Sequence, residues 1–340
     1  MRDGMHTHGF VYIINHGLTQ PQRDRMFDIA DVAFAQVPED EKKQFTANFK
    51  ETGLYSGYKL RQYWHIDNGV RDQIEHFNMN RQIYGCDIYP KALQPFLPEM
   101  RAFAEYNHYN ILHPILRLLA LGMELPEELF VDMHKFEAPG ETWCECQCPR
   151  PDFQNAGLQA VFHYAAHAKF ASYPRSEEDE KNSKNVWLKG HTDFGTITIL
   201  WSQPVTALQI LSHDGKWRWI RHIDNALVVN IGDAMELLSG GFYKGTIHRV
   251  VQPPADQRGR ERLGVFYFAL ADDAVRLVPR VESPVLQRVG VQRRVADDDA
   301  PTMEAMRKAR TAAYGTSTLK KRADGNEEEV LAGMTVKHFN

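Results

Sequence analysis

The chain has 340 residues, 43% of them hydrophobic and 25% charged, a composition typical of a globular protein with a substantial buried core. A net charge of -4 gives no reason to expect nucleic acid or an anionic membrane as a partner. Even the apolar run at 111–125 is interrupted by polar residues, and the N-terminus lacks the apolar stretch of a secretory signal. Four cysteines do not suggest a disulfide framework, so we expect a cytoplasmic protein.

The first third of the chain predicts one strand and two long helices. β-Branched and aromatic residues at 10–14 indicate the strand. Thr19 then has the features of a helix N-cap, with Pro21 in the first turn and apolar residues following at helical spacing. A second helical pattern runs over 98–121, where Pro114 should introduce a kink. We interpret both helices as scaffold, because amphipathic stripes usually face the core.

Residues 141–186 are the least regular stretch, and we predict an insertion or loop there. Three cysteines separated by single residues precede a His-x-x-x-His pattern: Cys144, Cys146, Cys148, His163 and His167. The pattern can be interpreted as a zinc site, but structural zinc sites usually separate their cysteines by two to four residues. We favour a surface insertion with incidental cysteines, followed by a solvated charged loop at 175–184.

From residue 187 onward, short strands separated by turn signals dominate. The expected strands lie at 196–201, 208–211, 217–220, 226–232, 245–251 and 263–270. Short strands at regular spacing favour an antiparallel sandwich or barrel. The predicted fold class is therefore α+β, with a double-stranded β-helix (jelly-roll) core flanked by N-terminal and C-terminal helices. The C-terminal helix is expected at 303–314, followed by a charged, mobile tail.

The pattern with the clearest chemistry is His191-Thr192-Asp193, with a further candidate ligand at His248. Side chains alternate along an extended segment, so His191 and Asp193 should point to the same face. Two imidazoles and one carboxylate on one face of an octahedral metal leave the opposite positions open for substrate and dioxygen. This arrangement is typical of non-haem Fe(II) oxygenases.

The chain resembles the isopenicillin N synthase-like 2-oxoglutarate/Fe(II) dioxygenases, in particular the fungal members of that family. The resemblance rests on seven ordered segments: 7–17, 71–78, 188–195, 214–217, 225–233, 248–251 and 262–268. It covers nearly the whole chain except 144–168 and the last residues. The 54 residues between Asp193 and His248 match the spacing that the triad usually has in this family.

The resemblance implies an Fe(II)-dependent dioxygenase that uses 2-oxoglutarate and O2, with ascorbate as a stimulant. It implies that His191, Asp193 and His248 bind the iron, and that Arg262 and Tyr173 bind 2-oxoglutarate. The expected reaction is hydroxylation or desaturation of a small-molecule, secondary-metabolite substrate, with release of succinate and CO2. Phe194 and Trp201 are candidate walls of the substrate pocket, and plain core packing is the alternative for both.

We expect a monomer built as one oxygenase domain over 1–340, with no nucleic-acid or membrane partner. Its parts are expected to be a mainly helical segment, a loop or insertion, the jelly-roll core with the iron site, and a C-terminal helix with its tail, at 1–140, 141–186, 187–280 and 281–340.

Three features depart from the family pattern. The usual Arg-x-Ser appears as Arg262-Leu263-Gly264, which keeps the guanidinium but offers no hydroxyl. Arg258 and Arg260 are rivals for the same role, and the apolar strand that follows Arg262 favours Arg262. The family's Asn-x-Tyr-Pro appears as Ala171-Ser172-Tyr173-Pro174. Finally, the chain begins almost at the first matching strand, without the usual leading strand and helix.

Other functions stay open at this stage. An iron-dependent oxidase that does not use 2-oxoglutarate would need no Arg262. A catalytically inactive jelly-roll binding protein would not need the triad. A zinc-dependent interaction protein would use the cysteines together with His163 and His167.

Overall fold

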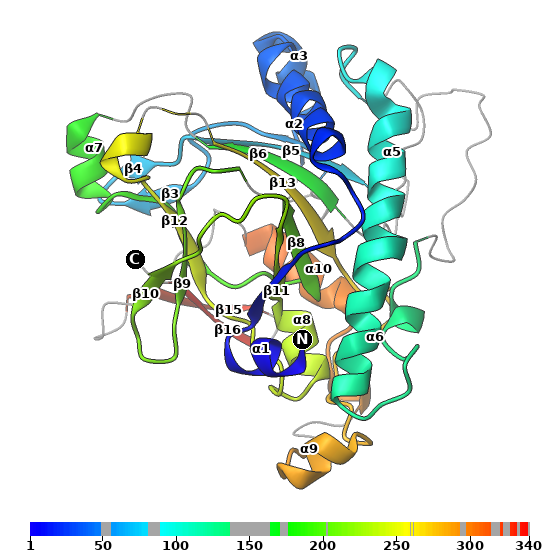
Figure 1. The fold of residues 1–340 in the computed structure, drawn as a ribbon. Helices are drawn as coiled ribbons and strands as arrows, with labels where there is room; N and C mark the ends of the chain where they lie inside the picture. Colours follow the sequence, from blue (N-terminus) through cyan, green and yellow to red (C-terminus); the bar gives the residue numbers. More distant parts are fainter. Residues whose placement is uncertain are drawn as a thin grey trace.

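The computed structural model describes residues 1–48, 56–80, 89–136, 164–170, 176–201, 203–258, 260, 262–292, 297–313, 320–321, 327–331 and 334–338. Two antiparallel sheets face each other and form a jelly roll, and helices cover the outer face of the larger sheet (Figure 1). The α+β class and the double-stranded β-helix core expected from the sequence are thereby confirmed.

The larger sheet has seven strands, and its central members are apolar five-residue runs that are buried along their whole length. Their order is β1 (Phe10–Ile13), β11 (Leu227–Ile231), β8 (Ile197–Trp201), β13 (Arg262–Ala269), β6 (Tyr164–Phe170), β5 (Ile74–Asn80) and β2 (Gly57–Lys59). Burial on both faces is typical of a sheet that separates a helical layer from a second sheet.

The smaller sheet carries two of the candidate ligands. Its order is β10 (Trp217–Trp219), β9 (Leu208–Leu211), β12 (His248–Val251) and β7 (Val186–His191), and a separate hairpin pairs β3 (His65–Asp67) with β4 (Val70–Arg71). β12 and β7 pair antiparallel, so that His248 lies opposite His191, and the register shifts beyond this pair. Antiparallel pairing thus joins residues that are far apart in the sequence.

Helices pack on the outer face of the larger sheet, where the main hydrophobic core lies. Gln22 accepts hydrogen bonds from the backbone and hydroxyl of Thr19, which confirms the predicted N-cap of α2. At the position of the predicted kink, a π-helical turn that ends at Leu112 joins α5 to α6, and Pro114 lies in the first turn of α6; the two helices run along one side of the molecule (Figure 1). The helices concerned are α2 (Gln20–Ala35), α3 (Glu39–Gln44), α5 (Leu97–Tyr106), the π-helix (Asn107–Leu112) and α6 (His113–Gly122).

The remaining helices are short or lie near the C-terminus. They are α1 (Arg2–Thr7), α7 (Glu177–Asn182), α8 (Asp233–Leu238), α9 (Pro284–Arg288) and α10 (Met303–Ala313), with 3-10 turns at Gln94–Phe96, Val131–Met133, Ala255–Gln257 and Asp297–Asp299. No helix among the described residues is both long enough and apolar enough to cross a bilayer.

Several local expectations need correction. The stretch predicted as an insertion or loop contains β6, which is central to the larger sheet, and α7, which begins at the capping hydroxyl of Ser176. The predicted mobile tail instead forms a small sheet, in which β15 contacts α10 and β16 contacts β7. Its strands are β14 (Lys320–Lys321), β15 (Glu327–Leu331) and β16 (Met334–His338). α1 precedes the first strand, so a short leading helix is present after all.

Candidate metal centre

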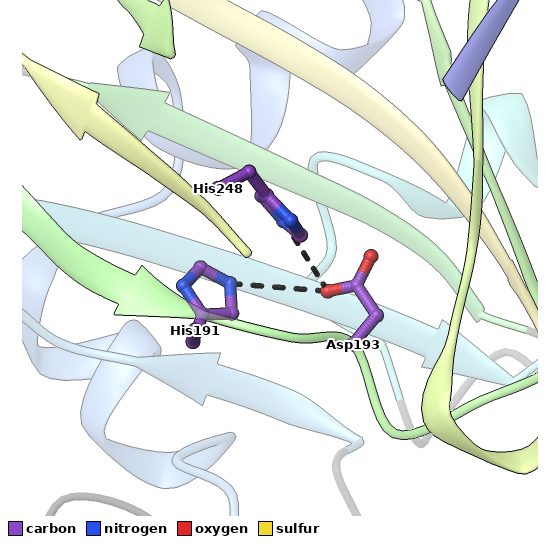
Figure 2. Close-up of side chains that lie close together, drawn as sticks. All are labelled: His191, Asp193 and His248. Atoms are coloured by element: carbon purple, nitrogen blue, oxygen red, sulfur yellow. Dashed lines mark ion pairs between the residues drawn. The ribbon is translucent and has the colours of Figure 1, made fainter. Parts of the chain in front are cut away.

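His191, Asp193 and His248 come together at one end of the smaller sheet (Figure 2). His191 is the last residue of β7, Asp193 follows two residues later, and His248 is the first residue of β12. Oδ1 of Asp193 lies 3.8 Å from Nε2 of His191 and 3.6 Å from Nε2 of His248. Three side chains from two neighbouring strands therefore converge on one point in space.

Backbone carbonyls fix the orientation of both imidazoles. Nδ1 of His191 lies 2.8 Å from the carbonyl oxygen of Lys189, and Nδ1 of His248 lies 3.1 Å from that of Thr246. A carbonyl oxygen can only accept, so each Nδ1 donates its proton, and Nε2 is the nitrogen of each ring that faces Asp193 and can ligate a metal. Imidazoles that ligate metals in proteins are held in this way.

The two carboxylate oxygens of Asp193 have different partners. Oδ2 accepts hydrogen bonds from the hydroxyl of Thr198 at 2.6 Å and from the amide of Asn230 at 2.8 Å. Oδ1 faces the two imidazoles. Burial works to raise the pKa of this carboxyl, but His248, His191 and the two hydrogen bonds together lower it. Asp193 is therefore held as a carboxylate with one oxygen available to a cation.

The donor set fits Fe(II). The three ligand atoms lie within 4.8 Å of one another, and burial followed by the charge of His248 lowers the pKa of His191 to about 4. His191 is thus a neutral imidazole at physiological pH, which is the form that binds metals. Its side chain is 26% exposed, so the centre can be reached from solvent. Two imidazoles and a carboxylate on one side leave the other coordination positions open.

The C-terminal helix supports the loop between the two ligands of the HxD motif. Arg310 of α10 donates to the carbonyl oxygen of Thr192 at 2.9 Å and pairs with Asp233 at 3.2 Å. The backbone N–H of Asp233 donates to the carbonyl oxygen of Asp193 at 2.7 Å. Arg307, one turn earlier on α10, forms a buried ion pair with Asp273 at 2.9 Å. One arginine therefore ties the loop between His191 and Asp193 to a helix that is anchored independently.

Arg262 lies at the start of β13, on the strand row that faces the smaller sheet. It is 4% exposed, donates to the carbonyl oxygen of Val205 at 3.3 Å, and lines a small, partly open cavity. Burial lowers its pKa to about 10, so it stays charged at neutral pH. Arg258 and Arg260, its rivals in the sequence, are exposed.

Gly264 has a steric explanation. A Cβ at this position would lie 2.7 Å from Cε2 of Phe266, because the Phe266 ring folds back over the glycine. That ring also stacks on Phe268, with ring centroids 5.5 Å apart. The position where the family usually has a serine is therefore covered by an aromatic ring.

The other candidate residues differ in their placement. Trp201 projects from the outer face of β8, donates from Nε1 to Oδ1 of Asn107 at 2.9 Å, and packs in the main core. Its contacts favour the core interpretation over the pocket wall. Phe194 is partly buried and also packs against that core. Tyr173, Cys144, Cys146, Cys148 and His163 lie outside the described residues, as does the side chain of His167.

The sequence analysis missed Thr198, Asn230, Asp233 and Arg310. Asn230 carries a readable signal, because it is the one polar residue in the buried run Leu227–Ile231. Thr198 is less visible, since threonine is common in strands. Arg310 gives no signal at all, because its contact to Thr192 spans 118 residues.

Two family profiles match the chain in order and together cover more than half of it. Residues 1–95 match the N-terminal region of non-haem dioxygenases in morphine synthesis. Residues 157–269 match the 2OG-Fe(II) oxygenase superfamily, and this range includes the three residues of the centre and Arg262.

Similar proteins include enzymes and solved complexes. The 2-oxoglutarate-Fe(II) type oxidoreductase hxnY of Emericella nidulans is 26% identical over 285 residues, 79% of this chain and 72% of that protein. Full-length Neurospora crassa T7H with alpha-KG and thymine superposes with a TM-score of 0.69 at 20% identity, over 92% of this chain and 89% of that one. JOX2 with 2OG, Fe and JA gives 0.62 at 20% identity, over 83% and 73%.

Proposed function

The chain belongs to the 2OG-Fe(II) oxygenase superfamily, and from that premise we propose how its residues divide the work of an Fe(II)/2-oxoglutarate-dependent oxygenase. His191, Asp193 and His248 hold Fe(II), and Arg262 holds the distal carboxylate of 2-oxoglutarate. The observation that carries this proposal is the convergence of two imidazoles and one carboxylate, with Oδ1 of Asp193 within 3.8 Å of both Nε2 atoms.

When bound, iron and 2-oxoglutarate supply the activation of dioxygen that oxidises a substrate C–H bond, with release of succinate and CO2. The protein binds and orients the iron and 2-oxoglutarate. Thr198 and Asn230 hold Asp193, so that the same carboxylate oxygen always faces the centre. Arg262 presents a buried cation to which a carboxylate can pair in a bidentate manner.

The cavity beside Arg262 supports this assignment. It is bordered by apolar side chains of the inner strand rows, among them Leu200, Leu208 and Val228. An apolar wall excludes water from a charge pair, which strengthens the pair and lets it select a dicarboxylate. The exposed guanidinium groups of Arg258 and Arg260 offer no such setting.

We propose that the substrate is a small molecule, a secondary metabolite, and that the enzyme hydroxylates or desaturates it. Support comes from the relatives, since T7H was solved with thymine and JOX2 with JA. Three protein ligands leave room for a small molecule beside the iron. The loops around a jelly-roll site vary, so the fold alone does not name the substrate.

An anaerobic titration tests the proposal. Adding Fe(II) and 2-oxoglutarate should produce a weak metal-to-ligand charge-transfer band, which His191→Ala should abolish. Absence of the band in the wild-type protein would favour the inactive jelly-roll alternative. Turnover without 2-oxoglutarate would favour the oxidase alternative.

A second experiment concerns the substrate. The protein is incubated with Fe(II), ascorbate, 2-oxoglutarate and extracts of a strain that lacks the gene. We expect a small molecule to gain one oxygen or lose two hydrogens, in step with succinate formation. Oxidation found only on a protein or nucleic acid would overturn the small-molecule assignment.

A further inference from the structure

The inner face of the seven-stranded sheet, which faces the smaller sheet, continues from the iron ligands to the far strand β5. Thr198 of β8 and Asn230 of β11 mark this face, because both bond Asp193. Leu200 of β8 lies opposite Phe266 of β13, and Phe266 lies opposite residue 166 of β6. Residue 166 in turn lies opposite Asn78 of β5. Directly paired residues of antiparallel strands project from the same face. Asn78 therefore projects from the side of the sheet that carries the centre.

His76 occupies the next inward position on the same strand. It lies opposite Lys59 of β2 on one side and opposite residue 168 of β6 on the other. Residue 168 lies opposite Gly264 of β13. Its ring makes an edge contact with Trp64, with centroids 5.0 Å apart. Burial, followed by the nearby charges of Lys59 and His191, lowers its pKa well below the usual value. The strand register places His76 on the same face of the sheet as Asn78.

Both side chains hold buried polar atoms that have no hydrogen-bond partner among the described residues. Asn78 is 1% exposed, and within the described part of the chain neither its Oδ1 nor its Nδ2 has a hydrogen-bond partner. Nε2 of His76 is likewise buried and unbonded there. A buried polar group left unpaired typically costs about 1–3 kcal/mol, and most native proteins pair nearly all such groups. Two on one strand face therefore call for a physical reason.

The buried ion pair of Lys59 and Asp72, beside His76, is by contrast fully hydrogen-bonded. Lys59 is fully buried, yet its ammonium bonds Asp72 at 2.7 Å and the carbonyl oxygen of Ile74 at 2.6 Å. Asp72 in turn accepts from the backbone N–H of Trp64 at 2.6 Å. The fold thus provides hydrogen-bond partners for a buried ammonium on the adjacent strand, but provides none within the described residues for the amide of Asn78.

We infer that His76 and Asn78 form a polar recognition site for the substrate, an inference that rests on the proposed function. A primary amide presents one donor and one acceptor side by side, and it pairs best with a ligand edge that offers the complement. The class of substrate indicated is a small molecule with an amide or lactam edge, N–H next to C=O. His76 adds one further hydrogen bond from its ring nitrogen.

Calorimetry with two defined probes tests this inference. The full-length protein is loaded anaerobically with Fe(II) and 2-oxoglutarate and titrated with 2-pyridone, a lactam, or with N-methyl-2-pyridone, in which the donor is blocked. The wild type should bind 2-pyridone about tenfold or more tightly than the methylated probe, because the methyl group leaves the Asn78 oxygen unpaired. Asn78→Leu should abolish that difference, and His76→Phe should reduce the affinity for 2-pyridone.

Stability supplies an independent readout. If Asn78 is kept for a ligand, Asn78→Leu in the metal-free protein should unfold at the same temperature as the wild type or higher, because an unpaired buried amide is removed. A lower unfolding temperature would assign Asn78 a structural role and overturn the inference. So would failure of the wild type to bind 2-pyridone, or equal binding of both probes.

The charge-transfer band separates the two proposals. Asn78→Leu should leave the band and the 2-oxoglutarate affinity unchanged, since Asn78 is assigned to bind neither the iron nor 2-oxoglutarate. Loss of the band from the wild-type protein refutes the proposed function itself. An intact band without discrimination between the probes refutes only the recognition site.

Discussion

The two faces of the seven-stranded sheet differ in how they treat polar atoms. On the outer face, Trp201 bonds Asn107 at 2.9 Å, and the Tyr58 hydroxyl bonds the carbonyl oxygen of Ala33 at 2.7 Å. On the inner face, Oδ1 of Asp193 faces the centre, and the side-chain amide of Asn78 has no hydrogen-bond partner within the described chain. These two outer groups are thus satisfied by the protein itself, whereas Oδ1 of Asp193 and the amide of Asn78 on the inner side are left open to ligands.

Because side chains alternate along a strand, neighbouring residues project to opposite faces and have these different roles. Leu200 and Trp201 are neighbours in β8, but one borders the cavity beside Arg262 and the other packs under the helices. The difference implies that outer substitutions change stability, whereas inner ones change ligand binding. Residues kept for function are commonly not optimal for stability.

The largest expected effect tests the inner face. His191→Ala or Asp193→Ala should abolish iron retention and succinate formation, because two remaining ligands hold a labile ferrous ion too weakly. The metal-free His191→Ala protein should still unfold near the wild-type temperature, since this side chain is 26% exposed. Iron content, succinate yield and thermal unfolding are the measurements.

His65→Ala is the matched control for that experiment, since His65 is an exposed histidine of β3. It should keep full iron content and turnover. Wild-type turnover in His191→Ala would refute the triad. A large loss of stability in metal-free His191→Ala would remove the distinction between the two faces.

The sequence was sufficient to predict that His191, Asp193 and His248 come together and where most strands lie. The HxD pattern and the strands both depend on short-range patterns. His191-x-Asp193 follows from alternation along a strand, and the strands from 196 to 270 follow from apolar runs between turns. β6 was missed because it follows a long polar, cysteine-rich stretch and owes its place to pairing with β5 and β13. Tertiary pairing overrides local propensity in such a segment.

The C-terminal contacts could not be predicted for a related reason. Charged residues in the tail predict solvation, yet β15 pairs with β16, and α10 reaches Thr192 through Arg310. Nor does a strand pattern show that Asn78 lacks a partner, because an unpaired amide is visible only once its neighbours are placed. The sequence thus indicates which residues can bind a metal, while the structure shows which groups the fold leaves open.

On the outer face, Trp201→Ala should lower the free energy of unfolding by about 3–5 kcal/mol. The change leaves a cavity under the helices and removes the partner of Asn107. Urea unfolding of the metal-free protein measures the loss, and Trp201→Phe, which keeps a ring, should lose less. The folded fraction of Trp201→Ala should bind 2-oxoglutarate normally; weakened binding at unchanged stability would contradict the outer-face assignment.

Arg262→Ala should raise the 2-oxoglutarate requirement strongly, because truncating one partner of a buried charge pair costs about 2–5 kcal/mol. Arg258→Ala and Arg260→Ala, which change exposed side chains on the preceding loop, should do much less. The apparent Kd for 2-oxoglutarate, measured by anaerobic titration, compares all three. A larger effect from Arg258→Ala would move the carboxylate site from the strand to the loop.

The smallest effect concerns Arg310, which lies outside both sheets and reaches the centre only through the backbone. Arg310→Ala removes the hydrogen bond to Thr192 and the ion pair to Asp233, so the loop between His191 and Asp193 gains freedom. Loss of such supporting contacts typically weakens metal affinity about 10–100-fold. We expect the low end of that range, because Asp233 still bonds the backbone of Asp193 through its own N–H.

An Fe(II) titration distinguishes this positioning role from general support of the fold. Lys308→Ala is the control on the same helix, because its side chain is 57% exposed and bonds only Glu304 among the contacts described. Arg310→Ala should weaken iron binding while the 2-oxoglutarate affinity of the iron-saturated protein stays close to wild type, and Arg310→Lys should recover part of the loss through the ion pair. An equal loss in Lys308→Ala, or lower stability with unchanged iron affinity, would show that α10 supports the fold and not the ligand loop.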